Sequence, residues 1–146
     1  MARVEIETRL NYTASLIEYK FRRTTMITHT RLYADEHGES HFEEIEIDLT
    51  LTECAPPAPP LELSSITPAK QFGFMRAPAG WSSDWHPSAA RNVFFVLTGE
   101  WEVTASDGDV RRFPAGSVLR VEDTTGKGHS SRVVSDSLAV MLQLGD

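Results

Sequence analysis

The C-terminal half of the chain is a series of short apolar runs separated by glycine and proline, and this pattern limits the possible folds most. From residue 70 onward the runs are KQFGFMRA, NVFFVL, WEVTA, VRRF, SVLRVE, SSRVV and LAVMLQL. Asp107-Gly108 lies between two of them and predicts a tight hairpin, because aspartate and glycine tolerate the positive φ of such turns. Many short strands at close spacing predict an all-β sandwich or a closed barrel.

The N-terminal half is organised around a proline-rich run, APPAPP, at residues 55–60. Four prolines in six residues exclude a helix or a central strand and predict an extended connector. Before it, residues 41–53 alternate apolar with acidic or threonine side chains, which predicts a half-buried strand at a sheet edge. Residues 1–30 fit either a short amphipathic helix or an irregular strand. The predicted organisation is therefore an N-terminal arm, 1–30, and a single domain, 31–146.

Size and charge exclude several classes of protein. A chain of 146 residues fits one domain with a substantial core. The net charge of −7 and the absence of a basic stripe argue against a nucleic-acid partner. No apolar run approaches the roughly 20 residues that span a bilayer, and the N-terminus does not read as a secretory signal. With the lone Cys54, which has no partner for an intrachain disulfide, these features predict a cytoplasmic protein without a membrane partner.

Two segments of the C-terminal half resemble the two sequence motifs of the cupin superfamily. The first is GWSSDWHPSAARNVFFVLTGE, residues 80–100. Five residues separate Gly80 from His86, and six separate Asn92 from Gly99, as in the first cupin motif. In this frame Ser88 takes the position of the second cupin histidine, and Asn92 takes the position of the glutamate.

The second segment is RRFPAGSVLRVEDTTGKGHSS, residues 111–131. Pro114 and Gly116 match the cupin turn, and Gly126 precedes His129 in a loop about two residues longer than usual. The run VEDTTGKGH and the acidic strand before a proline-rich connector are also similar to those of a group of small single-domain cupins. The resemblance implies an all-β cupin jelly roll, the double-stranded β-helix barrel, with an N-terminal arm.

The resemblance also implies a metal site, although one with fewer ligands than the family pattern. The family pattern of three histidines and a glutamate holds Fe, Mn, Ni or Zn. Here His86 and His129 remain, and Asn92 offers only a neutral oxygen. If the frame slides so that His86 is the second ligand, Asp84 becomes the first, giving two histidines and one carboxylate. We therefore predict one divalent transition metal that is weakly held or absent.

Several polar and aromatic residues around these motifs are candidates for a pocket. Trp81 and Trp85 flank the first motif and supply apolar area with little loss of entropy. Glu122 ends a predicted strand at the barrel mouth. For its neighbour Asp123 we favour a turn former that accepts from the loop amides over a general base. The predicted pocket residues are Trp81, Trp85, Ser88 and Glu122.

Three functions remain open at this point. The first is the binding of a small molecule in the barrel with a depleted metal site. The second is a metal-dependent oxygenase or isomerase that uses His86 and His129. The third is a structural or regulatory dimer without a ligand. The resemblance also implies a homodimer, because cupins commonly pair through sheet edges and the acidic strand looks like such an edge.

Overall fold

The structure, a computed structural model, describes residues 26–145 and divides the chain into two compact units. Among these residues, the larger unit takes in Thr28–Glu46 and residues 66–145, and the smaller takes in residues 26–27 and Ile47–Ser65. All nine strands and no helix lie in the described part, which confirms the all-β prediction. A helix that could cross a membrane is accordingly not found among residues 26–145. Most of the predicted arm lies outside the described residues.

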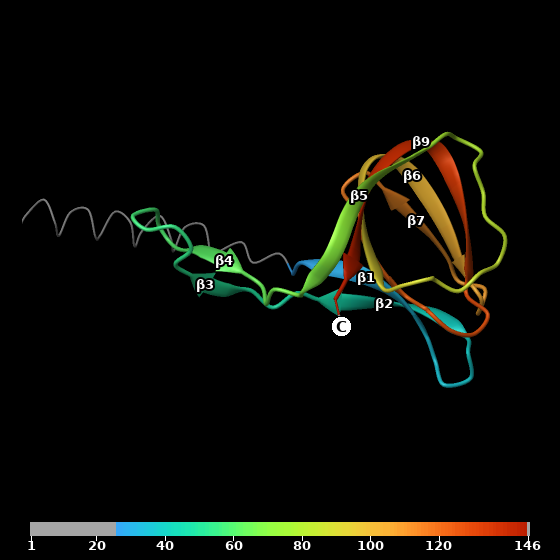
Figure 1. Ribbon diagram of the computed structural model, residues 1–146, viewed down its shortest axis with the longest axis horizontal. Helices are drawn as coiled ribbons and strands as arrows, with labels where there is room; N and C mark the ends of the chain where they lie inside the picture. Colours follow the sequence, from blue (N-terminus) through green and yellow to red (C-terminus); the bar gives the residue numbers. More distant parts are fainter. Residues whose placement is uncertain (1–25, 146) are drawn as a thin grey trace, which may run out of the picture. The chain divides into compact units, whose positions relative to one another are not determined.

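The larger unit is one seven-stranded sheet that curls around a central space (Figure 1). Its strands follow the order β2-β1-β8-β6-β9-β5, and β7 pairs with β6. β1 and β8 run parallel, whereas the other pairs are antiparallel. The acidic strand β2 lies at one end of this order, as predicted for an edge; its pairing with a second copy stays a prediction. The strands are β1 Thr28–Ala34, β2 Ser40–Glu46, β5 Ala69–Ala77, β6 Asn92–Ala105, β7 Val110–Pro114, β8 Val118–Glu122 and β9 His129–Leu144.

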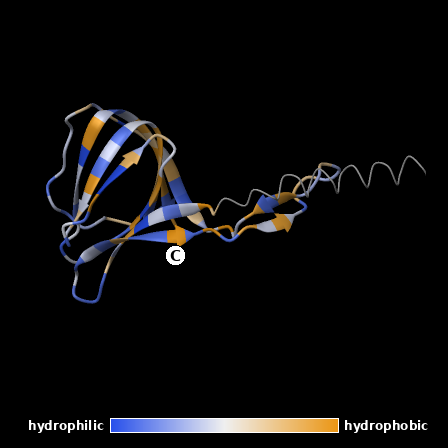
Figure 2. Ribbon diagram, turned by 180° about the vertical axis from the view of Figure 1, so that it is seen from behind, coloured by the Kyte–Doolittle hydropathy of each residue, from blue (hydrophilic) through white to orange (hydrophobic). Residues whose placement is uncertain are grey.

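Side chains along these strands alternate between the inside and the outside of the barrel, and Figure 2 shows the matching change between hydrophilic and hydrophobic residues. In β8, for example, Leu119 and Val121 are buried and Arg120 lies between them on the opposite face. The inward residues form one core cluster, against which Phe42, Phe94 and Trp101 pack. The buried members of the cluster are Leu32, Val96, Val103, Ala105, Phe113, Leu119 and Val121.

Two of the predicted strand pairs are single long strands in the structure. NVFFVL and WEVTA merge into β6, and SSRVV and LAVMLQL merge into β9. β6 and β9 pair along almost their whole length, with register shifts around Gly99. Gly99 has a φ of +75°, and a Cβ there would lie 2.3 Å from the carbonyl oxygen of Asp136. The glycine that looked like a turn is therefore a bulge that bends a continuous strand.

The predicted hairpin at Asp107-Gly108 is confirmed. β6 and β7 pair antiparallel up to Thr104 and Val110, and Gly108 has a φ of +92°. The carboxylate of Asp107 accepts a hydrogen bond from the amide of Asp109 at 2.9 Å, which fixes the turn.

The smaller unit contains an antiparallel pair, β3 (Thr50–Thr52) and β4 (Leu61–Leu63). The predicted strand 41–53 is thus two strands, β2 and β3, separated at residues 47–49. The proline-rich run between β3 and β4 makes a turn, in which the amide of Ala58 donates to the carbonyl of Ala55 at 2.8 Å. The prediction of an extended connector is wrong there, because the run has to reverse the chain within a short hairpin.

One histidine of the acidic strand is held between two carboxylates. His41 Nδ1 lies 2.7 Å from Asp107 Oδ2, and His41 Nε2 lies 3.1 Å from Asp35 Oδ2. Hydrogen bonds with Asp35 and Asp107 raise the pKa of His41. Hydrogen bonds from the Glu39 amide and from His41 lower the pKa of Asp35 to about 2.

We expect His41 to make the larger unit more stable in weak acid than in weak base. A histidine whose folded pKa is raised stabilises the fold fully below its unfolded pKa of about 6.5, and this contribution is lost as the pH rises through the folded pKa. Asp35, whose pKa is lowered to about 2, stays ionised in this window. Urea unfolding of the parent and of His41→Gln should therefore differ more at pH 5.5 than at pH 8.5. His37→Gln is the control, since that side chain is 82% exposed; an equal difference at both pH values would contradict the prediction.

Candidate functional site

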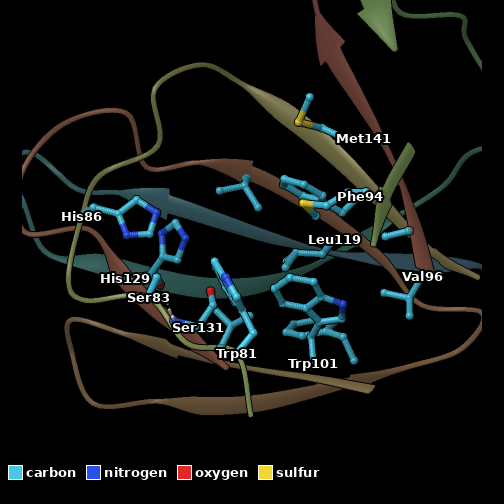
Figure 3. A pocket seen from close by; sticks show the side chains of 15 residues that line it. Trp81, Ser83, His86, Phe94, Val96, Trp101, Leu119, His129, Ser131 and Met141 are labelled. Carbon is cyan, nitrogen blue, oxygen red and sulfur yellow. Dashed lines mark hydrogen bonds between the residues drawn. The ribbon is translucent and has the colours of Figure 1, made fainter. Parts of the chain in front are cut away.

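The inner face of the barrel encloses a cavity of about 210 Å³. Figure 3 shows His86 and His129 together at one end of it, with Ser83 and Ser131 beside them and Trp81 and Trp101 further along the wall. The rest of the lining is apolar. Those residues are Met75, Phe94, Val96, Val103, Phe113, Leu119, Val121, Ala139 and Met141.

Residues 80–88 form one wall of the cavity and have no regular strand structure. Separate backbone hydrogen bonds join this segment to β9 and to the residues just before β9. The amide of Gly80 donates to the carbonyl of Val133, and the amide of Ser83 to the carbonyl of Ser131, both at 2.9 Å. Further along, the amide of Ser88 donates to the carbonyl of Asp123 at 3.0 Å. This segment supplies three residues of the lining, Trp81, Ser83 and His86.

The two motif histidines are brought together by their backbones. His86 and His129 form an antiparallel bridge in which each amide donates to the other's carbonyl at 3.0 Å. Their ring centroids lie 4.8 Å apart, with 50° between the ring planes. Gly128 allows this approach: its φ is +75°, and a Cβ there would lie 2.0 Å from the carbonyl oxygen of His86. Only glycine permits both that φ and that contact.

Hydrogen bonds at Nδ1 set the tautomer of both rings. His86 Nδ1 lies 2.8 Å from the carbonyl oxygen of Asp84, which can only accept, so Nδ1 donates. His129 Nδ1 lies 2.7 Å from Asp123 Oδ2 and donates to that carboxylate. A neutral imidazole protonated at Nδ1 presents Nε2 as an acceptor. Within residues 26–145 neither Nε2 has a hydrogen-bond partner.

Asp123 is a fully buried carboxylate behind His129, with 0% of its surface exposed. Besides His129 it accepts from the hydroxyls of Ser40, at 3.1 Å, and Ser88, at 3.0 Å. The interpretation as a turn former that accepts from the loop amides is wrong. A signal was present in the sequence, because Asp123 follows Leu119 and Val121 at the two-residue period and so continues the inward alternation just past the end of β8.

Of the four predicted metal ligands, His86 and His129 reach the cavity, whereas Asn92 and Asp84 are not among its lining residues. The side-chain amide of Asn92 donates to the carbonyl of Ala90 at 3.1 Å. Asp84 contributes its carbonyl to His86. The part of the chain that the structure describes contains no group of three His, Cys, Asp or Glu side chains placed to hold a metal ion. These residues do not fit the metal set that the resemblance implied.

Of the four predicted pocket residues, Trp81 lies in the lining. Its ring packs edge-on against Trp101, with centroids 5.6 Å apart. Ser88 supports Asp123 from behind, and Trp85 is 55% exposed. Trp101 was missed, although it stands at an inward position of β6; its indole N–H donates to the hydroxyl of Ser137 at 2.7 Å, which fixes the ring.

Glu122 lies in a cluster of arginines and not in the cavity lining. Its carboxylate accepts from Arg31, Arg91 and Arg120, and its side chain is 6% exposed. Burial alone raises the pKa of Glu122, but the hydrogen bonds from these three guanidinium groups outweigh it and lower the pKa to about 2. The ionised carboxylate therefore links β1, β8 and the start of β6 and is not available as a base in the cavity.

Comparisons with known proteins concern the fold only. No family model and no curated protein matches the chain. Among solved structures, a cupin-2 domain protein from Shewanella frigidimarina is 18% identical (TM-score 0.43, 51% of this chain and 70% of that chain). An RmlC-like cupin from Desulfovibrio desulfuricans is 16% identical (TM-score 0.41, 80% and 81%). The cupin domain of Schizosaccharomyces pombe Cnp3 is 20% identical (TM-score 0.42, 87% and 89%).

Identities this low transfer no activity, ligand or partner to the chain. The strand order, the inward alternation and the meeting of the two motif histidines at one end of the cavity are features of the chain itself. With its all-β sheet curled around that cavity, the chain forms a barrel, and cupins are among the solved structures to which it is similar.

Proposed function

We propose that the chain binds a small molecule with a mainly apolar body inside the barrel. The observation that carries this proposal is the cavity of about 210 Å³, whose walls are apolar except at the histidine end. An apolar cavity of about 150 Å³ is large enough to hold benzene, so this one has room for a substituted ring. Convergent polar groups at one end of an apolar pocket are the usual arrangement of a ligand site.

A cavity-filling variant tests this proposal. Ala139 is 1% exposed and lines the cavity, so Ala139→Leu should occupy the space that a ligand needs. We expect small aromatic probes, p-cresol among them, to raise the melting temperature of the parent by a few degrees at concentrations well above Kd, and to leave Ala139→Leu unchanged. Ala115→Leu, at an exposed turn position outside the lining, is the control and should respond like the parent. An equal response of both variants would place binding elsewhere.

The site is further proposed to work without a tightly held metal. Two neutral imidazoles without a carboxylate ligand give a low affinity for divalent ions. The rival, a metal-dependent oxygenase or isomerase, is favoured by one feature: Asp123 behind His129 is the kind of carboxylate support that metal-bound histidines commonly have.

Elemental analysis separates the two. We expect the purified protein, after incubation with Fe, Mn, Ni or Zn and desalting, to retain well under one equivalent of metal. His86→Ala and His129→Ala should then match the parent. About one equivalent in the parent, lost in both variants, would establish the metal-dependent reading instead.

A further inference from the structure

We propose that the ligand is a neutral molecule whose single hydroxyl group donates a hydrogen bond to Nε2 of His129. This inference rests on the proposed function, and it names the chemical class that the cavity selects. Alcohols and phenols with a compact apolar body belong to this class; carboxylates and plain hydrocarbons do not.

The choice of a donor follows from the tautomers of the two rings. Each Nδ1 donates to an oxygen that can only accept, so in the neutral rings each Nε2 is an acceptor. A carbonyl oxygen of a ligand would place its lone pairs against the lone pair of Nε2. A hydroxyl group can instead donate its proton to Nε2 in a hydrogen bond.

His129, and not His86, is the inner of the two acceptors. The side chain of His129 is 9% exposed, while His86 is exposed. A hydrogen bond to the less exposed acceptor discriminates more strongly between ligands, because a ligand that fills the cavity displaces water from it and a wrong ligand leaves it unsatisfied.

The charge behind His129 argues against an anionic ligand. Asp123 is fully buried, and within residues 26–145 its carboxylate forms no ion pair with a lysine or arginine. In its ionised form this group places a negative charge one imidazole ring away from the ligand head, where little solvent screens it. A ligand carboxylate would be repelled, and a neutral hydroxyl would not.

The hydroxyl group of Ser83, at the same end of the cavity, also favours a ligand with a hydroxyl group. Ser83 Oγ accepts from the amide of Ser131 at 3.1 Å, so its own proton is available to a ligand oxygen. A ligand hydroxyl, which both donates and accepts, can satisfy His129 and Ser83 together. The edge-on pair Trp81 and Trp101 then offers its apolar surface to the ligand body.

Three probes of similar shape test the inference: p-cresol, p-xylene and p-toluate. They differ in carrying a hydroxyl, a methyl or a carboxylate at one position of the ring. Titration calorimetry should give p-cresol an affinity about tenfold higher than that of p-xylene, the value of one net hydrogen bond. p-Toluate should be the weakest of the three.

A variant and a spectroscopic signal locate the effect. In His129→Phe the tenfold preference should disappear, while His37→Phe, at a side chain that is 82% exposed, should keep it. Because His129→Phe also removes a hydrogen bond to Asp123, its fold is checked by circular dichroism. In the parent, p-cresol and not p-xylene should shift the ¹⁵N resonance of His129 Nε2, which needs no substitution.

The outcomes separate this inference from the function on which it rests. Equal affinity for p-cresol and p-xylene, or a preference for p-toluate, overturns the inference and leaves small-molecule binding in place. No binding of any probe to the parent overturns both. A preference for p-cresol that survives in a folded His129→Phe also overturns the assignment to His129.

Discussion

Gly128→Ala should lower the free energy of unfolding by about 4 kcal/mol or more, a loss that single substitutions cause only through severe backbone or core defects. The added Cβ would lie 2.0 Å from the carbonyl oxygen of His86 and 2.2 Å from its carbonyl carbon. These are backbone atoms, so the clash cannot be relieved by a change of side-chain rotamer. Either the bridge between His86 and His129 breaks or the loop moves as a whole, and the histidine end of the cavity is lost in both cases.

The matched control is Gly108→Ala. Gly108 has a φ of +92°, yet a Cβ there would meet nothing within 4 Å. It therefore carries only the conformational cost of an alanine at positive φ, about 1–2 kcal/mol. Urea unfolding followed by circular dichroism compares the two variants. Equal destabilisation would mean that the approach of Gly128 to His86 is not maintained in solution.

Asp123→Ala should lower the free energy of unfolding by about 3 kcal/mol, because it leaves buried and half-buried donors without an acceptor. The hydroxyls of Ser40 and Ser88 and Nδ1–H of His129 all donate to this one carboxylate. The same change frees the His129 ring to adopt the other tautomer, so the preference for hydroxyl-bearing probes should weaken as well.

Two further variants serve as comparisons for the stability loss of Asp123→Ala. Ser88→Ala removes one donor and leaves the acceptor satisfied by two others, so we expect a loss of about 1 kcal/mol. Asp136→Ala removes an exposed carboxylate that accepts from the amide of Ala79 and should cost less than Asp123→Ala. Thermal and urea unfolding measure all three. If Asp123→Ala lowers the free energy of unfolding no more than Asp136→Ala does, the buried hydrogen bonds of Asp123 contribute no more to stability than an exposed one.

The all-β class and the positions of most strands could be predicted from the sequence because the two-residue alternation is a local signal. The hairpin at Gly108 was predictable for the same reason. Gly99 was not: a glycine between two apolar runs reads equally as a turn or as a bulge, and the pairing with β9 decides between them. Local periodicity does not indicate which distant strands pair with each other.

The candidate site was predictable only where the motif spacing applied. His86 and His129 were identified because the family pattern fixes their places, and the structure brings them together. Asn92 and Asp84 occupied ligand positions in that pattern, yet the Asn92 side chain donates to the carbonyl of Ala90, and Asp84 contacts His86 through its backbone carbonyl. Asp123 was misread because its partners Ser40 and Ser88 lie 83 and 35 residues away in the chain. The two-residue period marks Asp123 as inward, but spacing along the sequence does not reveal which distant residues it contacts.

The wall formed by residues 80–88 has a kinetic consequence. It is fastened by separate backbone hydrogen bonds and not by a continuous ladder, so it can detach while the pairing of β6 with β9 stays intact. Trp81, Ser83 and His86 line the cavity from this wall, so its detachment would widen the exit for a bound molecule. Amide hydrogen exchange at Gly80 and Ser83 should then be faster than exchange along the paired parts of β6 and β9.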